Sequence, residues 1–364
     1  MRVMHILSSS RFSGAENMVC QIIEMFKEDK QIEMLYCSPN GSISITLENN
    51  NIQYLPLKKI SILNIRYAIH QFNPDLIHAH DIKASVYTCL AAPLGIPIIS
   101  HLHGNHEDMK KLSIKSLLFS ILKRRFAKII VVSSSIKEDF FISSVLKDSE
   151  VISNITVEKT ILNSLKSSDI IDRFDIIFLG RLSYPKDPIR MIKIVDIVRK
   201  KIENLSCVIV GDGELMEEVR DEISKRGLLN TIKVLGFIEN PYQIINHSEI
   251  MIMTSRYEGT PMCALEAITL GLPIVSTPTD GILNIIDQGV TGFLSNSNEV
   301  LAEKITYLLL NKVTRDEFSK KAKEKSKAIN NVVLYKKRLK NIYSECNMKF
   351  HNKAIIKGTK TRDD

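Results

Sequence analysis

Two glutamates eight residues apart, Glu258 and Glu266, flank a segment that could hold a phosphorylated ligand. The apolar run 250–254 before them is typical of a buried strand, and a helix is predicted to begin near Met262. Free N–H groups at the start of a helix favour a phosphate, because several donors and the helix dipole point toward it. Ionised carboxylates accept hydrogen bonds from hydroxyl groups. The segment therefore predicts a site for a hydroxyl-rich phosphate ester, although two solvated glutamates on a surface helix would have the same spacing.

Two cations follow an earlier apolar run of the same half. Gly180 ends the run 175–180, and Arg181 and Lys186 flank the loop before a helix that is predicted to start near Pro188. Two cations held at the end of a strand can neutralise a diphosphate without a metal ion. The sequence contains no Asp-x-Asp pair of the kind that holds a divalent ion on such a group. The alternative is two surface cations near a turn.

The first half offers Gly14 and His103 at the ends of predicted strands. Gly14 lets the backbone approach a ligand closely, and His103 could hydrogen-bond a sugar or assist a proton transfer. His78 and His80 lie on one face of a similar strand and are interpreted either as structural or as supports for residues that contact the ligand. A metal site is not expected, because no Asp or Glu stands at ligand spacing beside these histidines and His-Glu-x-x-His is absent.

These residues require a scaffold that brings the ends of several strands together. Short runs rich in Ile and Val alternate with segments of helical spacing, as in a parallel α/β protein with right-handed crossovers. Ligands of such proteins bind at the carboxyl ends of the strands. The predicted strands are 2–7, 32–37, 75–79, 96–100, 128–133, 175–180, 206–210, 231–235, 249–254 and 272–276.

A chain of 364 residues is too long for one compact core, so two domains are expected. We predict an N-terminal domain over 1–165 and a C-terminal domain over 170–331, with five or six strands each and a polar linker within 153–172. A last helix is predicted at about 332–348, and a basic, polar, partly disordered tail at 349–364.

Composition and charge narrow the class of protein. The chain is 44% hydrophobic and 25% charged, which is typical of a soluble globular protein, and its six cysteines are scattered. The pattern favours reduced thiols in the cytoplasm. The net charge is +8, with basic residues in excess in 1–168 and 312–364 and acidic ones in 169–311. Nucleic acid is not an expected partner, because the second half is acidic and no recognition motif is present.

Residues 110–128 are predicted to form a basic, apolar helix. Such a helix either lies on anionic lipid or packs on the sheet with a solvated basic face. In the first case the protein would make peripheral contact with an anionic membrane.

Five motifs follow one another in the second half: Phe-Leu-Gly-Arg-Leu with a later Lys, Val-Gly-Asp-Gly, Leu-Gly-Phe-Ile, Glu-Gly-Thr-Pro with Glu-Ala, and Gly-Val-Thr-Gly-Phe-Leu. In this order they resemble the retaining glycosyltransferases of the E-x7-E type (family 4-like, group 1), which include many enzymes of bacterial surface polysaccharides. The resemblance runs from residue 1 to about 345. It implies the GT-B fold, with two facing Rossmann-like domains, an active site between them and a C-terminal helix that crosses back to the first domain.

The resemblance also implies roles for the residues that would surround the diphosphate and the sugar of a nucleotide-sugar donor. Arg181 and Lys186 would bind the diphosphate, together with the backbone N–H groups of Met262 and Cys263. Glu258 would contact the transferred sugar.

The resemblance implies further roles for residues near the nucleoside of the donor and for two residues of the first domain. Glu266 would accept the ribose hydroxyls, and main-chain groups around Phe237 and Ile238 would hold the base. Gly14 would face the diphosphate and the acceptor, and His103 would orient the donor sugar.

The implied activity is retaining transfer of a hexose or related sugar from a nucleotide diphosphate, UDP or GDP, without a metal or other cofactor. The acceptor would be a saccharide or a polyprenyl-diphosphate-linked glycan in capsule, exopolysaccharide or lipopolysaccharide synthesis, and the enzyme would work in the cytoplasm or on the inner face of the membrane. The alternatives are a non-catalytic accessory subunit of the same fold and a nucleotide-sugar epimerase. The chain departs from the family pattern at Ser153-Asn-Ile155, where Pro-Asn-Gly is usual, and at Asn284, where Glu is common.

Overall fold

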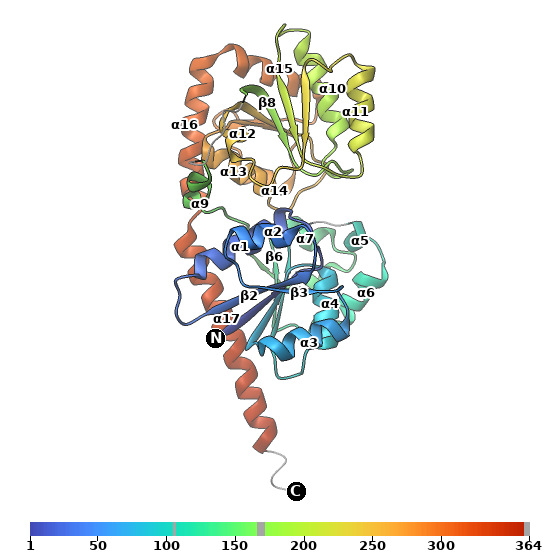
Figure 1. The fold of residues 1–364 in the computed structure, drawn as a ribbon, viewed down its shortest axis with the longest axis vertical. Coiled ribbons are helices and arrows are strands. Elements are labelled where there is room, and N and C mark those ends of the chain that lie inside the picture. Colours follow the sequence, from blue (N-terminus) through green and yellow to red (C-terminus); the bar gives the residue numbers. More distant parts are fainter. Residues whose placement is uncertain (105–106, 166–171, 360–364) are drawn as a thin grey trace. The chain divides into compact units, whose positions relative to one another are not determined.

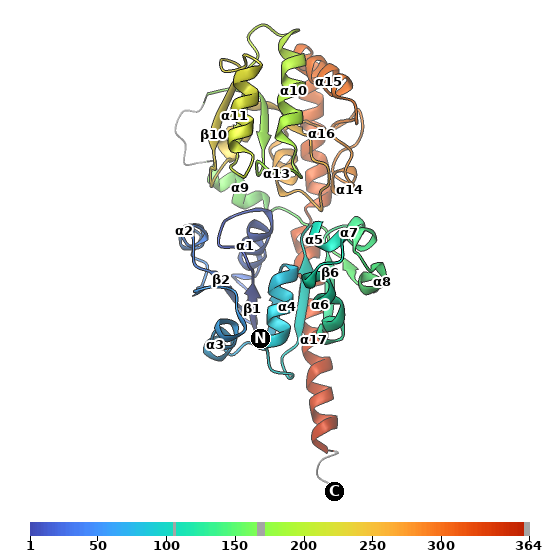
Figure 2. The same cartoon turned by 90° about the vertical axis from the view of Figure 1, so that its right-hand side faces the viewer.

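The computed structural model describes residues 1–104, 107–165 and 172–359. The chain forms two compact units (Figures 1 and 2): unit 1 comprises Met1–Asn154 and Val332–Asp364, and unit 2 comprises Ile155–Asn331. The division falls at Asn154, before the boundary that the sequence suggested at 165–170. Residues 166–171 of the expected linker and 360–364 of the expected tail lie outside the described residues.

Unit 1 is built on a seven-stranded parallel sheet with the order β3-β2-β1-β4-β5-β6-β7. The strands are β1 Arg2–Ile6, β2 Glu33–Pro39, β3 Tyr54–Leu57, β4 Leu76–Ala79, β5 Ile98–Leu102, β6 Lys128–Val131 and β7 Glu150–Val151. The helices are α1 Gly14–Phe26, α2 Ile43–Asn49, α3 Ile62–Phe72, α4 Ile82–Ala91, α5 Glu107–Lys110, α6 Ile114–Leu122, the 3-10 turn η1 Lys123–Arg125, α7 Ser134–Asp139, α8 Ser143–Leu146 and α17 Val332–Thr359.

Unit 2 is built on a six-stranded parallel sheet with the order β10-β9-β8-β11-β12-β13. The strands are β8 Phe174–Leu179, β9 Cys207–Val210, β10 Ile232–Gly236, β11 Ser248–Met253, β12 Ile274–Ser276 and β13 Gly292–Leu294. The helices are α9 Glu158–Ser164, α10 Pro188–Arg199, α11 Met216–Lys225, α12 Tyr242–Asn246, α13 Met262–Leu270, α14 Asp280–Leu283, α15 Asn298–Leu310 and α16 Lys312–Ile329.

Each sheet reverses its strand order once. In unit 1 the chain leaves β1 toward β2 and later returns to β4 on the other side, and in unit 2 it leaves β8 toward β9 and returns to β11. The loops that follow the two central strands therefore diverge, and open α/β sheets bind their ligands at this point. The functional residues expected from the sequence follow β1, β5, β8, β10 and β11.

Apolar strands and capped helices account for these elements. Every residue of β4, β5 and β9 is buried, as expected for strands covered on both faces. Several helices start at a side-chain cap: Asp81 accepts a hydrogen bond from Ala84 N at 2.7 Å, and Asp187 accepts one from Arg190 N at 3.2 Å. These caps set where the loops after β4 and β8 end.

Three strands were not predicted, and the first sheet has seven strands where five or six were expected. β3 is an edge strand that contains Pro56, and proline is tolerated at an edge because it has no ladder hydrogen bond to donate there. β7 has two residues and β13 has three, which is too short for a periodic pattern.

The single helix predicted over 110–128 is wrong. The segment forms α6 and the 3-10 turn η1, and β6 begins at Lys128. Ser113 stops a longer helix, because its side chain caps α6 by accepting a hydrogen bond from Ser116 N at 3.1 Å.

The last helix crosses back to unit 1 as expected. Tyr343 of α17 is buried against Phe26 of α1, with ring centroids 6.1 Å apart, and its hydroxyl lies 2.9 Å from His78 Nδ1. The helix continues to Thr359, through most of the segment expected as a tail. Within the described part of the chain, no helix is both long and apolar enough to cross a bilayer.

Candidate active site

Two loops at the reversal point of unit 2 are joined by hydrogen bonds. Thr254, directly after β11, donates from its hydroxyl to Lys186 O at 3.1 Å and to Asp187 O at 2.8 Å. The backbone N–H of Arg256 donates to Pro185 O at 2.8 Å. The loop after β8 and the loop after β11 therefore form one surface at the carboxyl edge of the sheet.

Lys186 and Glu258 form an ion pair on this surface, with Lys186 Nζ against Glu258 Oε1. Ser255 donates to the same carboxylate oxygen at 2.7 Å. The lysine side chain is 23% exposed and the glutamate side chain 10% exposed. Burial by itself lowers the pKa of Lys186, but the neighbouring carboxylate outweighs burial, so that the pKa is raised and the lysine is charged.

Arg181 and the start of α13 lie beside this ion pair. Arg181 is exposed and acts on Lys186 as a like charge, and the Cys263 thiol also interacts with the Lys186 charge. Met262 and Cys263 are the first two residues of α13, whose N-cap, Pro261, provides no side-chain cap. The N–H groups of a first helical turn have no carbonyl acceptor within the helix. Two cations and a helix N-terminus thus meet at one place, which is an arrangement that binds phosphate.

Glu266 lies one turn inside α13 and is 5% exposed. Tyr242, the first residue of α12, donates from its hydroxyl to Glu266 Oε1 at 3.3 Å. Tyr242 was not predicted from the sequence as a site residue. A tyrosine 24 positions away from its partner carries no local signal, and the contact arises because α12 packs against α13.

The loops after β8 and β9 approach each other more closely than side chains allow. A Cβ on Gly211 would lie 1.9 Å from Gly180 O, and one on Gly213 would lie 2.3 Å from Leu182 O. The Val-Gly-Asp-Gly motif therefore serves to pack one loop on the other. Phe237 and Ile238 follow β10, the next strand of the sheet, and the Phe237 side chain is exposed.

Gly14 and His103 occupy the carboxyl edge of the sheet in unit 1. Gly14 is the exposed first residue of α1, and Ser13 beside it donates a hydrogen bond to Glu16. His103 follows β5. Burial lowers its pKa to about 4, although the Asn154 side chain opposes the shift, so the ring is neutral near pH 7.

Five histidines cluster on β1, β4 and β5 and just beyond their ends. Two sets of three have ring nitrogens within 4.8 Å of one another: His5 with His78 and His80, and His80 with His101 and His103. The neutral imidazoles that burial enforces are also the form that binds transition metals. The absence of a metal, expected because no carboxylate stands beside these residues, stays a prediction.

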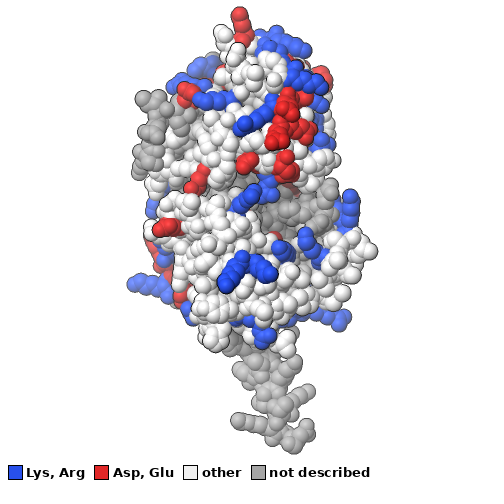
Figure 3. Space-filling view, turned by 45° about the vertical axis from the view of Figure 1, so that its right-hand side comes forward, with Lys and Arg blue, Asp and Glu red and all other residues white. Residues whose placement is uncertain are grey.

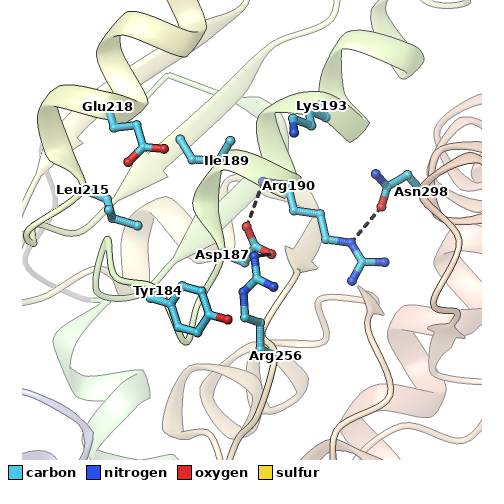
Figure 4. Close-up of a pocket in the computed structure, with 9 residues that line it drawn as sticks. All are labelled: Tyr184, Asp187, Ile189, Arg190, Lys193, Leu215, Glu218, Arg256 and Asn298. Atoms are coloured by element: carbon cyan, nitrogen blue, oxygen red, sulfur yellow. Dashed lines mark hydrogen bonds and ion pairs between the residues drawn. The ribbon is translucent and has the colours of Figure 1, made fainter. Parts of the chain in front are cut away.

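A pocket of about 320 Å³ opens on the helix side of the loop after β8 (Figure 4). Arg256 Nη2 lies 2.7 Å from Asp187 Oδ2, and the guanidinium carbon of Arg256 lies 4.4 Å from the centre of the Tyr184 ring. None of the site residues expected from the sequence is among those that line it, and its charges are mixed. The lining residues are Tyr184, Asp187, Ile189, Arg190, Lys193, Leu215, Glu218, Arg256 and Asn298.

Comparison with known families identifies the chain. Residues 164–325 match the family described as glycosyl transferases group 1, and residues 12–154 match glycosyltransferase family 4. The chain belongs to the group 1 glycosyltransferases. This confirms the family resemblance, and the two parallel sheets confirm the expected α/β architecture.

Known group 1 relatives align over different shares of the chain. The UDP-Gal:alpha-D-GlcNAc-diphosphoundecaprenol alpha-1,3-galactosyltransferase of Escherichia coli is 23% identical over 332 residues, which cover 82% of this chain and 85% of the relative. An uncharacterized glycosyltransferase of Methanocaldococcus jannaschii is 35% identical over 126 residues, and this match covers 35% of this chain and 30% of that relative.

Solved glycosyltransferase structures share the fold over nearly the whole chain. Anabaena HepE, crystallised with UDP-glucose, superposes with a TM-score of 0.79 at 21% identity, over 94% of this chain and 99% of that one. The pneumococcal O-GlcNAc transferase GtfA, crystallised with UDP and GlcNAc, gives a TM-score of 0.75 at 13% identity, over 95% of this chain and 99% of that one.

Proposed function

We propose that this glycosyltransferase transfers a hexose or related sugar from a nucleotide diphosphate to an acceptor hydroxyl, with retention of configuration and without a metal ion. The observation that carries the proposal is the meeting of Arg181, Lys186 and the N-terminus of α13 on one surface of unit 2. Two cations and a set of backbone donors stabilise a departing diphosphate where its charge develops. The HepE structure with UDP-glucose supports a UDP-sugar as donor.

The proposed reaction exchanges one bond at the anomeric carbon. The bond from this carbon to the diphosphate oxygen breaks, and a bond to the acceptor oxygen forms on the same face. The acceptor proton passes to the departing phosphate oxygen, so that the products are a glycoside and a nucleoside diphosphate. The protein then has to stabilise the leaving group and position both reactants.

Two carboxylates complete the donor site in this proposal. Glu258 contacts the transferred sugar, and Glu266 accepts hydrogen bonds from the ribose hydroxyls. The backbone N–H groups of Met262 and Cys263 bind the phosphates. The base lies against the main chain of Phe237 and Ile238, which the sheet order places two strands from β8.

In unit 1, Gly14 faces the diphosphate and the acceptor, and His103 orients the donor sugar. A ring that is neutral at physiological pH acts here as a hydrogen-bonding group and not as a charge. The printed name of the Escherichia coli relative contains a diphosphoundecaprenol acceptor. It supports a polyprenyl-diphosphate-linked glycan as the acceptor and surface polysaccharide synthesis as the pathway class.

We further propose that α6 holds the enzyme on the inner face of an anionic membrane. The helix buries Ser116 and Phe119 and exposes four apolar side chains, among them Ile114 at 80% and Ile121 at 66%. Exposed basic residues, Lys111, Lys115 and Arg124, flank this apolar face. On the face drawn in Figure 3, acidic side chains gather mainly on unit 2 and most charged side chains of unit 1 are Lys or Arg. An exposed apolar face flanked by basic side chains is typical of helices that lie in the interface of a lipid bilayer.

The donor is tested by incubating the protein with UDP-, GDP- and ADP-sugars in the absence of metal. Thermal shift reports binding, and release of the nucleotide reports slow hydrolysis. We expect a thermal shift and nucleotide release with one donor. Arg181→Ala should lose both, and Glu258→Ala should lose the release. A folded protein that responds to no donor would support the non-catalytic accessory subunit instead.

A further inference from the structure

Three of the clustered histidines form one hydrogen-bonded chain. His5 Nδ1 lies 2.8 Å from His80 Nε2, and His80 Nδ1 lies 2.9 Å from His103 Nε2. His5 belongs to β1, His80 directly follows β4 and His103 directly follows β5, and these three strands are neighbours in the sheet. The hydrogen-bonded series of histidines therefore starts in the interior of unit 1 at His5 and ends at the carboxyl edge of the sheet at His103.

Each of these bonds joins two ring nitrogens, so one proton lies between each pair. A neutral imidazole has one N–H donor and one acceptor nitrogen. Burial lowers the pKa of all three rings, to about 3 for His5 and to about 4 for His103, which keeps them neutral at pH 7. In a chain of neutral imidazoles every ring must donate in the same direction, which leaves two proton arrangements.

The two terminal nitrogens of the hydrogen-bonded histidines, His5 Nε2 and His103 Nδ1, distinguish these two proton arrangements. If His103 donated inward, the last N–H would be on His5 Nε2, which is buried without an acceptor among the described residues. If His5 donates outward from Nδ1, the last N–H is on His103 Nδ1. The Asn154 side chain adjoins His103 and favours its protonated form. His103 Nδ1 is likewise buried without a hydrogen-bond partner among the described residues. It belongs to a half-buried residue at the carboxyl edge, where the oxygen of a bound ligand can accept from it, whereas His5 lies fully buried in the interior. A buried N–H that no acceptor can reach is the costlier end, so the outward direction is favoured.

We propose that His5 and His80 form an imidazole relay that fixes His103 as the Nδ1–H tautomer. His80 is then a positioning residue: it holds the ring of His103 through Nε2 and makes Nδ1 a permanent hydrogen-bond donor for a ligand oxygen. The tautomer assignment stands on unit 1 alone, whereas its consequence for catalysis rests on the proposed role of His103 toward the donor sugar.

A metal ion in the same cluster is the competing interpretation. Ligands of a tetrahedral Zn²⁺, each at about 2.0–2.1 Å from the ion, lie roughly 3.3–3.4 Å apart and carry no proton between them. The nitrogen pairs His5–His80 and His80–His103 are 2.8 and 2.9 Å apart, which is hydrogen-bond geometry. The distances therefore favour a shared proton over a shared metal.

Nitrogen NMR of the protein labelled with 15N-histidine tests the relay without any substrate. We expect His5, His80 and His103 all to carry the proton on Nδ1, with couplings across both N–H···N bonds. A proton on His103 Nε2 would overturn the assignment. So would one equivalent of transition metal in protein purified without chelator, because a ligated nitrogen cannot also share a proton.

Three variants separate positioning from stability. In His80→Leu we expect His103 to become a tautomer mixture, with kcat lowered by ~10-fold or more, as for lost outer partners of other functional histidines, and with the donor KM nearly unchanged. His80→Gln should restore the Nδ1–H tautomer and most of kcat, because an amide donates to His103 Nε2 and accepts from His5 Nδ1. His78→Leu is the matched control: His78 is equally buried, but its Nδ1 lies against the Tyr343 hydroxyl at 2.9 Å, outside the relay.

These measurements show separately whether the proposed histidine relay is wrong and whether the proposed transferase activity is wrong. If the wild-type spectra show the relay but no nucleotide sugar reacts, the relay stands and the proposed transferase activity is wrong. If the wild type transfers sugar while His80→Leu matches His78→Leu in tautomer and kcat, the relay is wrong. Should His80→Leu not fold, as judged by circular dichroism, the wild-type spectra and His80→Gln decide the question.

Discussion

Lys186 and Glu258 are 72 positions apart in the chain and meet as an ion pair where the second sheet reverses its strand order. In the proposed reaction the same lysine binds the donor diphosphate. The diphosphate must therefore draw Lys186 away from Glu258 or share it, so the glutamate competes with the ligand while it holds the lysine in place.

This competition predicts opposite effects of two substitutions on UDP binding. Lys186→Met should weaken UDP by about 10-fold or more, because a charge-assisted contact is lost. Glu258→Gln should bind UDP more tightly than the wild type while transfer is abolished, because the competitor loses its charge. Isothermal titration measures both. Lys193→Met, a lysine of the neighbouring pocket, is the control and should bind UDP as the wild type does. Weaker UDP binding in Glu258→Gln would show that no competition exists.

Glu266 should determine how strongly the enzyme requires ribose hydroxyls. We expect the wild type to bind UDP about 10-fold more tightly than its 2′,3′-dideoxy analogue, and Glu266→Ala to bind both equally. Tyr242→Phe removes the hydroxyl that donates to Glu266 and should have a smaller effect in the same direction. A preference that survives in Glu266→Ala would assign ribose recognition to another residue.

The buried histidines should make unit 1 sensitive to acid. Burial lowers the pKa of His5 to about 3 and of His103 to about 4, from 6.5. Below pH 6.5 the unfolded chain binds protons that the folded unit does not, so stability is complete above pH 6.5 and declines as the pH falls toward these values. At pH 5 each of the two would contribute a loss of about 2 kcal/mol.

Thermal unfolding by circular dichroism at several pH values measures this loss. His101→Phe removes one buried ionisable ring whose pKa burial also lowers, and neither of its ring nitrogens has a hydrogen-bond partner among the described residues. The variant should therefore lose less stability than the wild type between pH 6.5 and 5. His70→Phe, at an exposed position on α3, is the control. Equal pH dependence in wild type and His101→Phe would contradict the prediction.

Membrane binding through α6 can be measured by sedimentation with vesicles. The protein should bind vesicles rich in phosphatidylglycerol more than vesicles of phosphatidylcholine, and binding should weaken with salt. Ile121→Ser should reduce it several-fold, because burial of an apolar side chain in lipid is lost. Leu310→Ser, at a site of similar exposure in unit 2, should bind normally. Equal losses in both variants would argue against α6 as the contact.

Removal of metal ions should leave catalysis intact. We expect equal transfer rates with excess EDTA and with added Mg²⁺, because Arg181 and Lys186 take the place of a cation on the diphosphate in the proposed mechanism. A rate that falls in EDTA and returns with Mg²⁺ or Mn²⁺ would contradict it.

The sequence predicted those elements whose apolar runs are long enough to show a period. Strands such as β8 and β11 and the start of α13 at Met262 lie within a residue or two of the expected positions. The edge strand β3 and the short β13 were missed, because a few residues with a Pro or a Gly carry no pattern. The break before α6 was missed because it depends on the N-cap at Ser113.

By itself the sequence determined the local parts of the site. The spacing of Glu258 and Glu266 places one carboxylate in the loop and the other one turn inside α13, because a helix start and its period are local properties. The tertiary structure decided which of these parts meet. Lys186 reaches Glu258, and His80 reaches both His5 and His103, because the sheets put strands side by side that are far apart in the chain. Apolar periodicity specifies that a strand is buried but not which strand lies next to it, so these contacts had to come from the packed sheets.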